Sequence, residues 1–141
     1  IAAQPQQRQR EMAVWVCRRL CALCPDAGVD WEAALRALAA GEPLPPPFDD
    51  EASAWESVLP DPTIVVTQGW FGYEPRHVEP GPIDPRAAAL AAVLAAAQPD
   101  PGVGACLALD QARLARSPDG SRVGADIVAA FRSRFAPPAA R

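Results

Sequence analysis

The stretch TIVVTQGWFGYEPRHVE, residues 63–79, differs in composition from the rest of the chain. It opens with the only clear run of β-branched residues, TIVVT at 63–67, which favours a β-strand. Gln68 and Gly69 fit the turn of a hairpin whose second arm is WFGY, residues 70–73. We therefore expect a small β element at this point, with helices before and after it.

Apolar periodicity and capping residues predict five helices outside this stretch. Asp30 is a residue type that accepts hydrogen bonds from the free amides of a first helical turn, and Gly41 is suited to closing the same helix. Asp84 followed by Pro85 gives a second start of this kind. The five predicted helices span about 8–24, 31–40, 51–59, 85–98 and 123–135.

Residues 103–109 predict a further strand, because Val103, Ala105, Leu107 and Leu109 alternate along it. The fold class predicted from all of these elements is α+β and predominantly helical. It has about five helices and a small β element of one hairpin or two to four short strands. We expect one compact domain over residues 8–136, between flexible ends at 1–7 and 137–141.

Composition narrows the classes of function. The chain has 141 residues and a net charge of −4, which weighs against a protein that mainly grips nucleic-acid backbone. All 13 basic residues are arginine, and lysine and asparagine do not occur, which indicates the GC-rich genome of a bacterium or a DNA virus. No secretory leader pattern is visible and no apolar run reaches the ~18 residues of a membrane span. We expect an intracellular protein, in cytoplasm or nucleus, with no membrane contact.

Cys17, Cys21 and Cys24 form the one motif that suggests metal chemistry. Their spacing of i, i+4 and i+7 places all three thiols on one side of the predicted helix, where free cysteine behaves as a small apolar group. Zinc sites usually draw paired cysteines from turns instead. We therefore predict no metal and no cofactor. The alternative is a small metal protein or enzyme that uses this stripe with Cys106, or uses His77.

The aromatic half of the opening stretch is the predicted partner-binding site. Trp70, Phe71 and Tyr73 stand beside Arg76 and His77, and aromatic residues and arginine dominate the energetics of protein interfaces. The competing interpretation is that these rings anchor a long loop to the core. His77 has no nucleophile at a recognised spacing, so the sequence predicts no enzyme.

The predicted function is a non-enzymatic protein-interaction, assembly or regulatory domain, which would be a module of a larger protein. Its partner would be another protein or a second copy of the chain. A further alternative is a nucleic-acid-binding domain that uses arginines of the first and last helices. Those residues would form one basic patch if the two helices are neighbours: Arg18, Arg19, Arg132 and Arg134.

Overall fold

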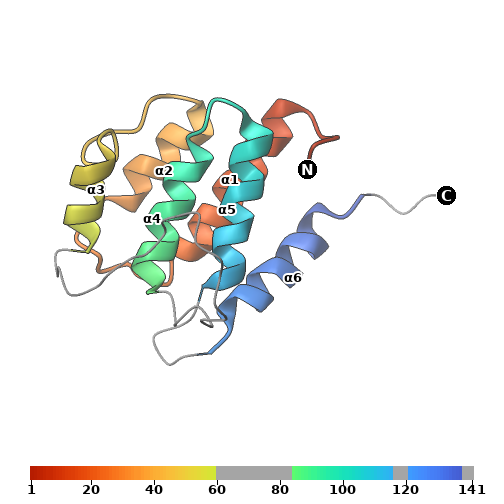
Figure 1. Cartoon of the computed structure of the whole chain (residues 1–141). Coiled ribbons are helices and arrows are strands. Elements are labelled where there is room, and N and C mark those ends of the chain that lie inside the picture. The colour runs from red at the N-terminus through yellow and green to blue at the C-terminus, as the bar shows by residue number, and fades with distance from the viewer. Residues whose placement is uncertain (60–83, 116–120, 138–141) are drawn as a thin grey trace, which may run out of the picture.

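The computed structural model describes residues 1–59, 84–115 and 121–137 (Figure 1). Its helices are α1 (Gln6–Cys21), α2 (Trp31–Ala40), α3 (Glu51–Val58), α4 (Pro85–Ala96), α5 (Pro101–Leu114) and α6 (Val123–Phe135). The described part of the chain contains no strand, so the predicted α+β class with about five helices is wrong: this part is all-helical, with six helices. The predicted hairpin at 63–73 lies outside the described residues.

The extra helix, α5, replaces the strand predicted at 103–109. One oxygen of Asp100, Oδ1, accepts hydrogen bonds from the backbone nitrogens of Gly102 (2.8 Å) and Val103 (3.2 Å). Pro101 takes the first helical position, where a missing N–H costs nothing. The buried residues then follow helical spacing and are all small: Gly102, Gly104, Ala105, Ala108 and Ala112. The prediction failed because it weighed the larger residues, of which Val103 and Leu107 lie on the outer side of the helix.

The helix starts that rested on capping residues are confirmed. The carboxylate of Asp30 accepts from the backbone nitrogen of Ala33 at 3.1 Å, and Gly41 closes α2 with a φ of 68°. The carboxylate of Asp84 accepts from the backbone nitrogen of Arg86 at 2.8 Å. Each cap satisfies a first-turn amide that has no partner inside its own helix.

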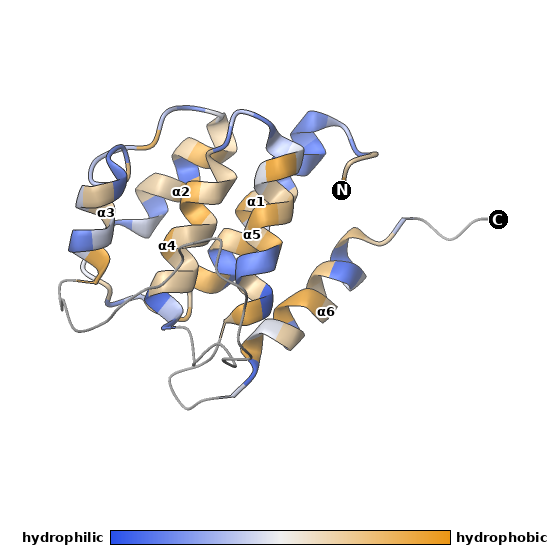
Figure 2. Cartoon of the chain, in the orientation of Figure 1, coloured by the Kyte–Doolittle hydropathy of each residue, from blue (hydrophilic) through white to orange (hydrophobic). Residues whose placement is uncertain are grey.

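Three helices, α1, α4 and α5, pack against one another at the centre of the bundle. α2 packs on α1 and α4, α3 on α4, and α6 on α5 and α1. Figure 1 shows α6 extending from the lower end of α5. The large side chains that are fully buried come from α1, α3 and α4: Val16, Leu20, Val58, Leu90 and Val93. Figure 2 shows hydrophobic residues along α4, α5 and α6. None of the described helices combines the length and the apolar character needed to cross a bilayer.

Small residues bring two pairs of helices into close contact. At Gly104 of α5, an added Cβ would lie 3.0 Å from the carbonyl oxygen of Ala95 in α4. At Gly124, in the first turn of α6, the backbone nitrogen donates to the carbonyl oxygen of Ala115 at 3.2 Å. An added Cβ at Gly124 would overlap the last carbonyls of α5. Glycine is therefore required at the α5–α6 corner for reasons of space.

Candidate protein-interaction surface

The residues predicted to bind a partner lie outside the described part of the chain. They are Trp70, Phe71, Tyr73, Arg76 and His77. Their role stays a prediction.

The cysteine stripe is part of the core. Cys17 and Cys21 lie on α1, Cys24 follows it, and all three side chains are buried. Burial removes water from the thiolate form and raises the pKa of Cys17 to about 12 and the pKa of Cys24 to about 11. Burial likewise raises the pKa of Cys21, and the neighbouring Cys17 raises it further. The burial of all three side chains agrees with their interpretation as small apolar groups in the core.

The structure does not bring the fourth cysteine to this stripe. Cys106 is exposed on α5. Within residues 1–59, 84–115 and 121–137, no group of three or more His, Cys, Asp and Glu side chains is placed to hold a metal ion. The version of the metal alternative that joins the stripe to Cys106 therefore has no geometric basis, and the version that uses His77 lies outside the described residues.

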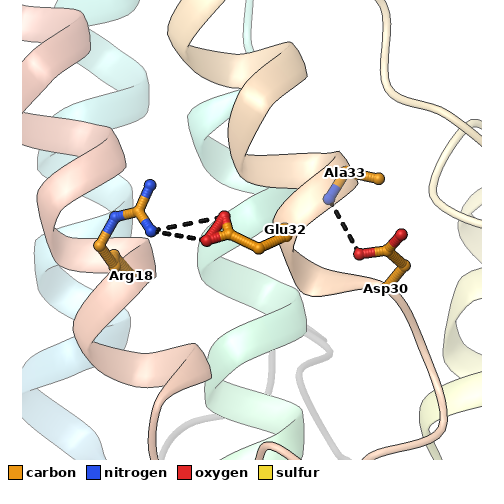
Figure 3. A network of polar contacts seen from close by, with 4 residues as sticks. All are labelled: Arg18, Asp30, Glu32 and Ala33. Carbon is orange, nitrogen blue, oxygen red and sulfur yellow. Dashed lines mark hydrogen bonds and ion pairs between the residues drawn. The ribbon is translucent and has the colours of Figure 1, made fainter.

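The helices α1 and α6 are in contact, which is the condition for the predicted basic patch of arginines. Arg18 turns to α2, where its Nη1 donates to Glu32 Oε1 at 2.9 Å (Figure 3). Arg19 lies over the ring of Trp15, with its Cζ atom 4.8 Å from the ring centroid. The ring of Trp15 packs in turn against Phe131 of α6, with ring centroids 6.0 Å apart. Arg132 and Arg134 are exposed near the end of the same helix, and the nucleic-acid alternative stays a prediction.

The surface that the sequence interpretation missed is the outer side of α5. Val103, Leu107 and Leu114 expose 49 %, 41 % and 43 % of their surface, and they are the large apolar residues most exposed in the described chain. Together with the other exposed residues of the same side they form what we call the α5 stripe: Val103, Cys106, Leu107, Asp110, Arg113 and Leu114. Each position has another member of the set three or four residues away, which places them along one side of a helix. The signal was present in the sequence as small residues at the complementary helical positions.

A groove continues this apolar surface towards α3. It has a volume of about 550 Å³, and its apolar walls include Leu44, Phe48, Trp55, Leu94 and Leu107. Phe48 is held in place by Trp31 of α2, with ring centroids 5.6 Å apart. We call it the α3–α5 groove. Leu107 belongs to both the groove and the α5 stripe, so the two form one continuous surface.

Charged groups lie at the rim of the groove and within the α5 stripe. Asp49 and Glu51 line the groove near the start of α3. On the α5 stripe, Arg113 Nη1 lies 3.8 Å from Asp110 Oδ1, and both side chains are more than 60 % exposed.

Comparison with protein-family models, curated proteins and solved structures finds no match to the chain.

Proposed function

We propose that this chain is a non-enzymatic protein-interaction or assembly domain that binds its partner through the α5 stripe and the α3–α5 groove. The single observation that carries the proposal is the continuous apolar surface that Leu107 shares between the two. Exposed apolar residues that stand alone are ordinary, whereas a contiguous set beside a groove marks a contact site.

The energetics favour association at this place. Completing the burial of a half-exposed valine or leucine contributes roughly 1 kcal/mol. The α5 stripe offers three such side chains, and the groove offers the half-buried ring of Trp55, a residue type common at the centres of interfaces. The partner would present a complementary apolar side. Basic residues on that partner would suit Asp49 and Glu51.

The predicted contact residues of 70–77 would enlarge this surface or form a second one. The proposal for α5 and the groove does not depend on them. The intracellular location also stays a prediction from the sequence.

Affinity capture from the source cells tests the proposal with three tagged forms of the chain. These are the wild type, Leu107→Glu, and Ala129→Glu as the matched control. Ala129 is exposed on α6, so its substitution makes the same change of charge on a helix away from the groove. We expect wild type and Ala129→Glu to recover the same discrete protein and Leu107→Glu to lose it. Equal recovery by all three forms, or recovery of nothing by any of them, would count against the proposal.

A further inference from the structure

We propose that the α3–α5 groove holds an amphipathic helix of the partner protein, with a basic end of that helix beside Asp49 and Glu51. This inference rests on the proposed interaction function and names the chemistry of the partner. Two observations carry it: the gap between α3 and α5 over one side of α4, and the two carboxylates in that gap, which have no basic counterpart there.

The groove has the place that a further helix would take in the bundle. α3 and α5 both pack on α4, but their backbones do not come into contact with each other, so the side of α4 between them is open. Ala91, Leu94 and Ala95 line the groove from that side. Because they are three and four residues apart, the groove follows the axis of α4 through its second half. Trp55 of α3 and Leu107 of α5 line it from the two flanks.

A helix suits this groove better than an extended segment does. The three elements along the groove are helices, whose backbone groups are hydrogen-bonded within each helix. The described walls therefore offer no strand edge with which an extended segment could pair. A helix satisfies its own backbone groups and needs only an apolar side to enter. Ala91 and Ala95 present small side chains to it, and packed helices come closer where the side chains between them are small.

The charges of the groove specify a basic group on the occupant. Asp49 and Glu51 line the groove near the start of α3, and neither forms an ion pair within the described part of the chain. None of the described lining residues is basic. Ala97 and Gln98, which follow α4, also line the groove, and α4 has no basic residue in its last turn to offset the partial negative charge of a helix C-terminus. An arginine or lysine of the partner is attracted by both elements.

A synthetic helix tests the inference, with fluorescence anisotropy of the labelled peptide as the readout. The probe has about 15 residues, leucines at spacing i, i+4 and i+7, arginines in its last turn, and a side-chain bridge that keeps so short a peptide helical. The wild type should bind it. A peptide with glutamates in place of the arginines should bind at least about tenfold more weakly. An unbridged peptide with a proline at its centre, which breaks the helix, should bind at least about a hundredfold more weakly.

Two pairs of protein variants place the binding in the groove. Asp49→Arg should lose the preference for the arginine peptide over the glutamate peptide, whereas Asp26→Arg, the same charge change at an exposed aspartate outside the groove, should keep it. Trp55→Ala should bind the probe at least about tenfold more weakly. Val103→Ala, which shortens an exposed side chain of the α5 stripe outside the groove, should bind like the wild type. Far-UV circular dichroism checks that each variant keeps its helices.

The outcomes separate this inference from the proposed function. A wild type that does not bind the probe, equal binding of all three peptides, or unchanged binding by both Asp49→Arg and Trp55→Ala would each overturn the inference. If the wild type captures a protein that Leu107→Glu loses but does not bind the probe, the helix is overturned and the proposed function stands. If the probe binds as expected but capture from cells recovers nothing, the proposed function fails and the ligand preference of the groove stands.

Discussion

Gly124→Ala should destabilise the protein through overlap between α6 and the end of α5. An alanine Cβ there would lie 2.5 Å from the carbonyl oxygen of Arg113 and nearer still to that of Ala112, whereas ordinary contact begins at 3.4 Å. Both neighbours are backbone atoms inside or at the end of a helix, so α6 itself must move by roughly an ångström. A displacement of that size opens gaps between side chains, and each contact that is opened loses a quarter to a half of its van der Waals attraction. The contacts at risk include those of Ile127 and Phe131, which α6 buries.

Gly102→Ala is the matched control. Gly102 and Gly124 are each the second residue of their helix, so the gain in helix propensity and the change in the unfolded chain are nearly the same for both. At Gly102 the added Cβ meets only the ends of side chains, 3.0 Å from Gln9 Nε2 and 3.2 Å from Asp100 Oδ1. The difference between the two variants therefore reports the backbone overlap at α6 beyond the smaller side-chain shift that Gln9 and Asp100 must make at Gly102.

We expect Gly124→Ala to be less stable than Gly102→Ala by about 1–3 kcal/mol, the usual range for overpacking. Urea unfolding followed by far-UV circular dichroism measures the difference, and equal slopes against denaturant show that both variants unfold from comparable native states. Gly124→Ala with a stability equal to or above that of Gly102→Ala would refute the requirement for glycine at the α5–α6 corner.

Three more predictions concern charges, caps and thiols. The hydrogen bond from Arg86 is the main cause that lowers the pKa of Asp84. The ionised carboxylate therefore stabilises the fold above the ordinary pKa near 3.8, and this contribution is lost as the pH falls through the lower pKa of the folded state. Asp84→Asn should make the free energy of unfolding depend less on pH in the acid range. An unchanged pH dependence would contradict this prediction. Asp30→Ala removes the cap of α2 and should lower the free energy of unfolding in urea by about 0.5–2 kcal/mol. Asp26→Ala, which changes an exposed aspartate nearby, should lower it much less. Equal losses of stability in the two variants would argue against the cap. A maleimide should label Cys106 alone in the native protein and all four thiols after denaturation. Native Cys106→Ser is the control and should not be labelled. Rapid labelling of a second thiol in the native protein would contradict the burial of Cys17, Cys21 and Cys24.

Local chemistry explains which parts of the fold could be predicted. Asp30, Gly41 and Asp84 act through contacts within a few residues, so their roles can be inferred without knowing the rest of the chain. The helical stripe of Cys17 and Cys21 was predictable for the same reason. Helical spacing places both thiols on one side of α1, and the packing of that side against other helices buries them.

α5 shows why the remainder could not be predicted. Its buried residues are glycine and alanine, which carry little hydrophobic signal, and three of its larger apolar residues, Val103, Leu107 and Leu114, face outward. Whether Gly104 lies against a backbone depends on α4, a separate helix, and no pattern within 101–114 reports that contact. The candidate surface was missed together with the helix, since the stripe exists only if the segment is helical. The ion pair of Arg18 with Glu32 likewise depends on how α1 and α2 pack.

The alanine-rich contact between α4 and α5 has a thermodynamic consequence. Nearly half of the buried apolar residues in the described chain are alanine, which exposes little carbon when the protein unfolds. The heat-capacity change of unfolding grows with the apolar surface exposed, so it should be small for a helical protein of this size. A small heat-capacity change flattens the curve of stability against temperature. The bundle should therefore keep a modest but nearly constant stability over a broad range of temperature.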